Sequence, residues 1–165
     1  MAALNPGTTA PEFTLPSMDG KPFSLREALT RGPVVAAFFK ISCPTCQYAF
    51  PFLQRIHEAK ENNGITVVGI SQNEKKDTAA FIKQYGLTFS VLLDDTSIYP
   101  VSNAYGLTNV PTTFWIAQDG EIEISSVGWV RKEMEEVNHR AAAISGAGVK
   151  PLFHAGEQVA DFRAG

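Results

Sequence analysis

The only two cysteines among the 165 residues, Cys43 and Cys46, stand three positions apart in the run Cys43-Pro44-Thr45-Cys46. Two side chains at this spacing in the first turn of a helix lie close enough to form a disulfide without backbone movement. The unpaired N–H groups at a helix start also favour a negative charge, and hence a thiolate, on Cys43. The spacing therefore predicts dithiol–disulfide chemistry, with Cys43 as the reactive thiol and Cys46 deeper in the turn.

The residues around the pair predict the elements that hold it. Val34–Phe39 is an apolar run typical of a buried strand, and a helix is expected from Pro44 to about Glu61. Pro44 suits the first helical position, where its missing N–H is not needed, so Cys43 is the predicted N-cap. The stop signal Asn62-Asn63-Gly64 ends this helix. Its inward face is formed by Cys46, Ala49, Phe50, Leu53 and Ile56.

The order of the remaining elements predicts a single α/β domain over residues 1–165. Further strands are expected at residues 13–15, 22–24, 65–70, 91–93, 110–116 and 121–127, and helices at 25–29, 74–85, 99–105 and 131–144. Asp19-Gly20 and Asp119-Gly120 are hairpin turns, and Asp94-Asp95 marks another turn. This order favours a central mixed sheet flanked by helices, with one antiparallel edge.

The two ends of the chain lack such patterns. We expect residues 1–11 to form a loose, polar lead-in. Residues 147–165 form a C-terminal extension that is too apolar for a free tail. It is expected to pack on the domain through Leu152, Phe153, Val159 and Phe162.

Composition excludes several classes of partner. The net charge is −3 and there is no basic run, which argues against binding to nucleic acid or to an anionic membrane. No apolar stretch is long enough to span a bilayer. The first residues lack the features of a signal peptide, so the predicted location is cytoplasmic. The alternative is a periplasmic or exported protein from which a leader has been removed.

A second motif, together with the cysteine pair, resembles the thioredoxin superfamily. Val110-Pro111-Thr112 precedes a strand–Asp119-Gly120–strand hairpin. The run Pro-Glu-Phe-Thr-Leu at residues 11–15 and the Asp19-Gly20 hairpin look like the branch of the peroxiredoxins (alkyl hydroperoxide reductase/thiol-specific antioxidant proteins) and the thioredoxin-like cytochrome-maturation proteins. The resemblance implies a thioredoxin fold with an N-terminal β-hairpin extension. It also implies that Cys43 attacks, Cys46 resolves, and Val110 with a cis Pro111 binds substrate.

The chain departs from these families at positions that matter for proton transfer. Typical thioredoxins have a Trp where Ser42 stands and a buried Asp where Ala37 stands. The cytochrome-maturation relatives often have a Glu where Ala49 stands. The usual carboxylate that manages the proton of the buried thiol is thus absent at both places.

The peroxidase alternative ranks second. The peroxiredoxin motif P-x-x-x-[T/S]-x-x-C, counted back from Cys43, meets Lys40 and Ala36, so the Thr that helps to hold a peroxide oxygen is missing. Counted back from Cys46, it meets Cys43 and Phe39. A redox-inactive module that captures extended peptides is the third hypothesis. Zinc is disfavoured because the pair supplies two of four ligands and His57, His139 and His154 lack ligand spacing.

The function that these patterns favour is that of a thiol–disulfide oxidoreductase, with a role in cell redox homeostasis. Its redox-active disulfide would be Cys43–Cys46, and its substrates protein or small-molecule disulfides. We expect no cofactor, no metal and a monomeric chain. Electrons must be exchanged with a redox partner, a reductase or an oxidase, which the sequence does not identify.

Overall fold

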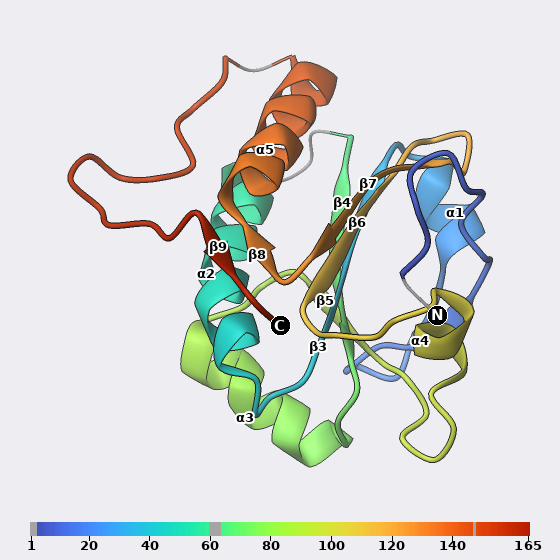
Figure 1. Cartoon of the computed structure of the whole chain (residues 1–165). Helices are drawn as coiled ribbons and strands as arrows, with labels where there is room; N and C mark the ends of the chain where they lie inside the picture. The colour runs from blue at the N-terminus through green and yellow to red at the C-terminus, as the bar shows by residue number, and fades with distance from the viewer. Residues whose placement is uncertain (1–2, 60–63, 147) are drawn as a thin grey trace.

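The computed structural model describes residues 3–59, 64–146 and 148–165 (Figure 1). Its centre is a five-stranded sheet in the order β5-β4-β3-β6-β7. Strands β3 (Val34–Phe39), β4 (Thr66–Ser71) and β5 (Ser90–Leu93) are parallel, whereas β6 (Thr112–Ile116) and β7 (Ile122–Val127) are antiparallel to their neighbours. The predicted mixed sheet with an antiparallel edge is confirmed.

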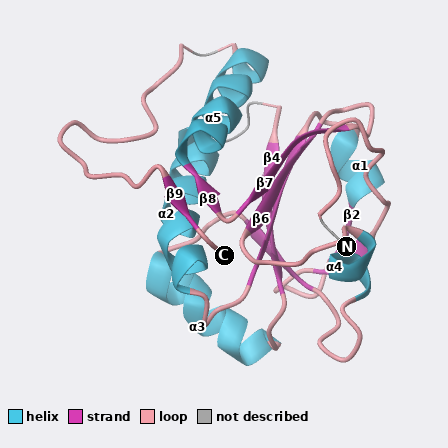
Figure 2. Ribbon diagram, in the orientation of Figure 1, coloured by secondary structure: helices cyan, strands magenta, loops and turns pink. Residues whose placement is uncertain are grey.

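Helices cover both faces of this sheet (Figure 2). Helices α2 (Pro44–Ala59), α3 (Lys75–Tyr85) and α5 (Arg131–Ser145) lie on one face, and the short helices α1 (Leu25–Leu29) and α4 (Pro100–Ala104) lie on the other. Helix α2 begins at Pro44 as predicted. Its predicted end near Glu61 and the stop signal at Asn62-Asn63 lie outside the described residues.

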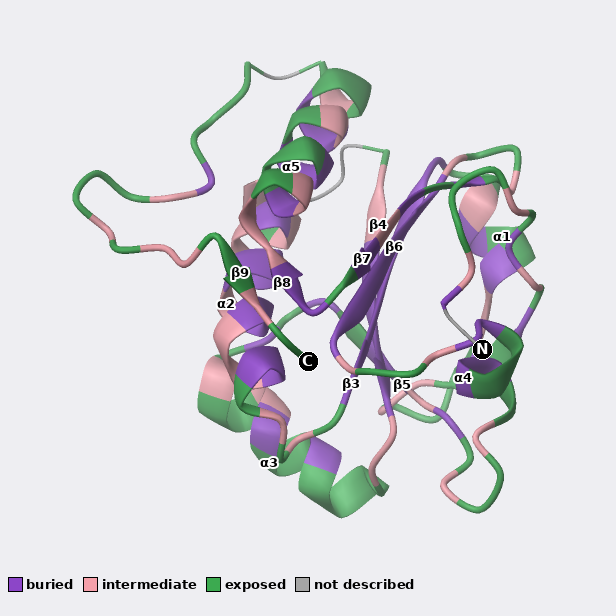
Figure 3. Cartoon of the chain, in the orientation of Figure 1, coloured by how far each residue is buried: buried purple, intermediate pink, exposed green. Residues whose placement is uncertain are grey.

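The central strand β3 is buried along its whole length (Figure 3). Because successive side chains of a strand point to opposite faces, its residues divide between two apolar cores. Val35, Ala37 and Phe39 pack with α2, while the alternate side chains pack on the other face with residues such as Leu25. This double burial fixes the position at which β3 ends and the chain turns toward α2.

The N-terminal hairpin is also confirmed. Strands β1 (Thr14–Pro16) and β2 (Pro22–Ser24) pair antiparallel across the Asp19-Gly20 turn. The expectation of a loose lead-in is wrong for the part of residues 1–11 that the structure describes. The N–H of Gly7 donates to the Ile122 carbonyl at 2.8 Å and the N–H of Ile122 donates to the Thr8 carbonyl at 2.8 Å, so this segment lies along the edge of the sheet at β7.

The C-terminal extension packs on the α2 side of the molecule, where it forms a strand pair that the sequence did not predict. Strand β9 (Phe162–Arg163) pairs antiparallel with β8 (Trp129–Val130). Leu152 is buried, but Phe162 is 62% exposed and takes no part in the packing that was predicted for it. In the described parts of the chain, no helix has the length and apolarity that a membrane span requires.

Candidate active site

Cys43 and Cys46 lie where the buried strand β3 gives way to α2. Both are free thiols; Cys43 is half-buried and Cys46 is fully buried. The Cys43 carbonyl accepts the N–H of Gln47 at 3.0 Å, as the carbonyl of an N-cap residue does. The helix thus presents the first sulfur at the surface and draws the second into the core, as the spacing predicted.

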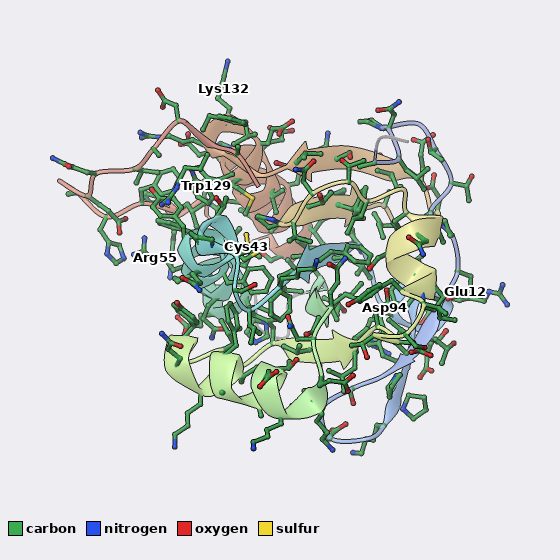
Figure 4. All side chains as sticks on the ribbon, turned by 60° about the horizontal axis from the view of Figure 1, so that its bottom comes forward. Glu12, Cys43, Arg55, Asp94, Trp129 and Lys132 are labelled. Carbon is green, nitrogen blue, oxygen red and sulfur yellow. The ribbon has the colours of Figure 1, made fainter. Side chains whose placement is uncertain are left out.

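Backbone groups are the polar partners of the Cys43 sulfur, whose side chain is labelled at α2 in Figure 4. The N–H of Cys46 donates to Cys43 Sγ at 3.2 Å, and the Cys43 thiol donates to the Val110 carbonyl oxygen at 3.3 Å. The first bond gives the Cys43 sulfur an otherwise unpaired N–H of the first helical turn. The second bond joins the sulfur to the loop before Pro111. One sulfur therefore contacts both the helix start and the proline loop.

The Cys46 thiol is held in its neutral form. Burial raises its pKa, and the neighbouring Cys43 thiol raises the pKa further. Ala37 and Ala49, the two positions at which the resemblance implied a carboxylate, are both buried in the same apolar cluster as Cys46. Among the groups that shift the pKa of Cys46 there is no carboxylate in the described residues.

The second predicted motif meets the cysteine pair in space. The Val110–Pro111 peptide bond is cis, as the resemblance implied. Pro111 is buried and its carbonyl accepts the N–H of Gly128 at 2.7 Å. Thr112 Oγ1 donates to the Asn109 carbonyl at 2.7 Å, which ties the loop before the proline to the start of β6. The loop therefore holds the Val110 carbonyl beside the Cys43 sulfur.

A pocket of about 430 Å³ opens beside Cys43. Lys40 and Gln72 line it on the side of β3 and β4, and Leu107, Thr108 and Val110 line it on the side of the proline loop. Lys40 is exposed, so the cation is at the mouth of the pocket. The size of the pocket fits a small organic molecule.

Sequence reasoning missed the contribution of the C-terminal extension to this site. Thr45, the second residue between the cysteines, is only 5% exposed, and its Oγ1 donates to the Ala164 carbonyl at 2.6 Å. Gly165 also lines the pocket. No local pattern links residues so far apart in the chain, although the apolar character of the extension signalled that it packs on the domain.

The described residues contain no group of three or more His, Cys, Asp or Glu side chains that is arranged to hold a metal ion. His57, the histidine on the same helix as the cysteines, stacks edge-on against the Phe89 ring with centroids 5.9 Å apart.

Comparison with known proteins agrees with this geometry. The model of the AhpC/TSA family matches residues 6–125. The chain is 30% identical, over 131 residues, to the thiol-disulfide oxidoreductase ResA of Halalkalibacterium halodurans, with 79% of this chain and 73% of that protein covered.

Solved structures show the same likeness. The putative thiol:disulfide interchange protein DsbE of Chlorobium tepidum superposes with a TM-score of 0.76 at 26% identity, covering 87% of this chain and 100% of that one. A secreted Mycobacterium tuberculosis disulfide oxidoreductase, homologous to E. coli DsbE, superposes with a TM-score of 0.64 at 26% identity, covering 79% of this chain and 95% of that one. A buried and a half-exposed thiol at this junction, in a thioredoxin fold with such relatives, make the protein a thiol–disulfide oxidoreductase, and the chain belongs to the AhpC/TSA family of the thioredoxin superfamily.

Proposed function

We propose that Cys43 is the attacking thiol and Cys46 the resolving thiol of a dithiol reductant. The Cys43 thiolate attacks one sulfur of a substrate disulfide, so that a mixed disulfide forms and the other substrate sulfur leaves as a thiolate. Cys46 then loses its proton and attacks Cys43 Sγ, which releases the second substrate thiolate. The substrate gains two electrons, and the chain is left with a Cys43–Cys46 disulfide.

The observation that carries this proposal is the contrast between the two sulfurs. Cys43 Sγ is partly exposed and accepts the N–H of Cys46, whereas Cys46 is fully buried and burial raises its pKa. A thiolate, not a thiol, is the nucleophile, so a first attack by Cys43 is favoured. Because Cys46 is buried, it does not meet disulfides in solution. It reacts only with the mixed disulfide that has formed on Cys43.

The proton of Cys46 needs an acceptor within the reaction itself. Ala37 and Ala49 supply no basic group. The substrate thiolate released in the first step is itself a base, and it forms beside the site. We infer that it takes this proton, directly or through water, and leaves as a thiol.

The substrate side of the site is built from backbone. We infer that an extended segment next to the substrate disulfide binds at Val110 and Pro111, where the chain before β6 runs along the mouth of the site. Both protein and small-molecule disulfides fit this chemistry. The oxidised chain requires a redox partner that returns its two electrons, and we expect residues 1–165 to act as one monomeric domain without binding nucleic acid.

The compartment stays a prediction. Disulfide reduction in the cytoplasm is the first of the two settings that we propose. The Mycobacterium tuberculosis relative is described as secreted, which supports the alternative that this chain acts in the periplasm or outside the cell. The direction of electron flow differs between the two settings.

A Cys46→Ser variant tests the roles of the two thiols. It keeps the nucleophile and removes the resolving thiol, so a stable mixed disulfide between Cys43 and a disulfide-containing substrate such as insulin should accumulate. The mass of the adduct and its release by dithiothreitol identify it. The matched control, Cys43→Ser, should form little adduct because Cys46 is buried. Equal trapping by both variants would show that the assignment of the roles is wrong.

The peroxidase alternative has less support in the geometry. Ala36, where the peroxiredoxin motif has its proline, is buried in β3 and packs in the core on the sheet face opposite to Cys46. Lys40 stands where the motif has its threonine, and it supplies an ammonium donor but no hydroxyl. Under this alternative, Cys46→Ser treated with hydrogen peroxide would accumulate a sulfenic acid on Cys43.

A further inference from the structure

Ala164 and Gly165, which follow strand β9, lie at the mouth of the dithiol site. From the β8–β9 pair the chain continues to Ala164, whose carbonyl accepts the Thr45 hydroxyl, and to Gly165, whose carbonyl accepts Asn109 Nδ2 at 3.5 Å. Figure 1 shows this end of the chain beside the start of α2. The segment thus touches both the Cys43–Cys46 turn and the loop that precedes Pro111.

Gly165 approaches the backbone of Val110 so closely that no side chain fits between them. A Cβ on Gly165 would clash with the carbonyl oxygen and carbon of Val110. The same carbonyl oxygen accepts the Cys43 thiol. The end of the extension therefore fills the space beside Val110 that an extended substrate segment would need.

The extension makes hydrogen bonds to β8, α2 and α5 upstream, and Ala164 and Gly165 each accept one side-chain hydrogen bond at this end. Trp129 Nε1 donates to the Ala160 carbonyl at 2.7 Å, the Ala160 N–H donates to Tyr48 Oη at 3.0 Å, and the Arg131 N–H donates to the Asp161 carbonyl at 2.9 Å. Ala164 and Gly165 are exposed, and their side-chain partners are Thr45 and Asn109. Ala164 and Gly165 can therefore leave the site on the loss of these two hydrogen bonds, while the upstream contacts stay in place.

A second route to Cys43 remains open while the segment is in place. The pocket of about 430 Å³ has Cys43 in its wall and is lined by Lys40, Gln72 and Leu107 as well as by Gly165. A small disulfide fits in such a volume. A polypeptide segment that runs along Val110 does not fit without displacing Gly165.

We propose that Ala164 and Gly165 occupy the part of the site where a polypeptide substrate would bind, and that they thereby determine its specificity. This inference rests on the proposed function. With the segment in place, Cys43 reacts with small disulfides through the open pocket. A polypeptide disulfide reacts only after Ala164 and Gly165 have moved away from Thr45 and Val110. The segment thereby makes the dithiol selective for small disulfides over disulfides in extended polypeptides.

The test uses the full chain and two variants that displace the segment in different ways. Gly165→Val introduces a side chain against the Val110 carbonyl, and Thr45→Val removes the hydroxyl that binds Ala164. The matched control is Gly148→Val in the same extension, where an added Cβ meets open space. Stopped-flow measurements on the reduced proteins give second-order rate constants with insulin and with 2-hydroxyethyl disulfide.

We expect the ratio of the insulin rate constant to the 2-hydroxyethyl disulfide rate constant to rise up to about tenfold in Gly165→Val and in Thr45→Val, as the loss of one hydrogen bond of ordinary strength allows. The ratio should stay at the wild-type value in Gly148→Val. An unchanged ratio in both displacing variants, with the small disulfide still reduced, would overturn the inference and leave the proposed function intact. A wild-type chain that reduces neither disulfide would overturn the proposed function itself.

Discussion

At the scale of single residues, two identical side chains differ because their surroundings differ. Cys43 sits at the helix start with a backbone N–H directed at its sulfur, and Cys46 sits one turn deeper in an apolar core. Under the proposed mechanism, the order of reaction follows from this contrast: the half-buried Cys43 sulfur acts first and the buried Cys46 sulfur acts within the mixed disulfide. The burial of Cys46 also makes the stability of the reduced protein depend on pH.

The raised pKa of Cys46 predicts a loss of stability at alkaline pH. In the unfolded chain this thiol ionises above about pH 8.5, while in the folded chain burial keeps it protonated. The unfolded state then binds fewer protons than the folded state, so the free energy of unfolding falls as pH rises. The slope for one such group is about 1.4 kcal/mol per pH unit.

Urea unfolding of the reduced protein from pH 7 to 10 measures this slope, and Cys46→Ala is the reference that removes the group. The difference in unfolding free energy between wild type and variant should shrink above about pH 8.5, the ordinary pKa of the thiol. Parallel pH profiles would show that Cys46 ionises as readily in the folded chain as in the unfolded one.

The Arg55–Glu157 ion pair predicts that the carboxyl of Glu157, in the C-terminal extension, has a lowered pKa. Arg55 Nη1 and Nη2 donate to the two carboxylate oxygens of Glu157 at 2.7 and 2.8 Å, and these bonds lower the pKa of Glu157 to about 2. The pair therefore stabilises the fold above the ordinary glutamate range, and that contribution is lost as pH falls toward 2. The ¹³C chemical shift of the Glu157 carboxyl should titrate near pH 2.

The Arg55→Ala variant is the control for this titration. Without the guanidinium of Arg55, the titration midpoint of the Glu157 carboxyl should return toward the ordinary pKa of a glutamate. A wild-type midpoint at that ordinary value would mean that the pair does not form in solution. The extension would then be held by its apolar and backbone contacts alone.

At the scale of elements, the N-terminus of α4 is capped by Asp94, a residue outside the helix. The carboxylate of Asp94, which is 2% exposed, accepts the N–H of Val101 at 3.2 Å and both the N–H and the hydroxyl of Ser102 at 2.8 and 2.7 Å. The N–H groups of Val101 and Ser102 belong to the first turn of α4 and have no partner within the helix. Asp94 thus caps a helix that starts several residues later.

Replacement of Asp94 by Ala should destabilise the protein by about 2 kcal/mol, because a helix cap is lost and buried donors are left without an acceptor. Urea unfolding measures the change. The control Asp95→Ala removes a neighbouring, exposed carboxylate that bonds within its own turn, and its effect should be smaller. Equal losses in the two variants would contradict the capping role.

Most elements were predictable because their patterns are local. The apolar run of β3, the proline at the start of α2 and the glycine that closes α3 in the left-handed conformation each act within a few residues. Strands β8 and β9 were not predictable, since two residues carry no periodicity and their partners lie some thirty positions apart. The cap of α4 by Asp94 was missed because Asp94 lies before the N-cap position of that helix, where its sequence signal indicated only a turn.

The candidate site was predictable to a similar degree. Cys43, Cys46, Val110 and Pro111 were singled out by motif, and the structure brings the two motifs together. The contacts of Thr45 with Ala164 and of Gly165 with Val110 depend on the path of the extension, which local sequence does not encode. The lead-in was misjudged because its hydrogen bonds go to β7, far along the chain.

At the scale of the whole molecule, the layers explain why the chemistry is at this edge. Strand β3 lies at the centre of the sheet, between β4 and β6, so its carboxyl end places Cys43 next to the start of β6 and the proline loop. The extension crosses from α5 over α2 to the same edge (Figure 1). The end of β3, the loop before Pro111 and the C-terminal extension are far apart in the sequence, and they meet around Cys43.

The central claim is that Cys43 of this converged site reacts with disulfides. The most direct test compares two second-order rate constants of the fully reduced protein, one with 2-hydroxyethyl disulfide and one with hydrogen peroxide, both followed by thiol loss and by tryptophan fluorescence. We predict that the disulfide reacts much faster, and that Cys43→Ser abolishes this reaction. A much faster reaction with hydrogen peroxide would contradict the account and identify the protein as a peroxidase.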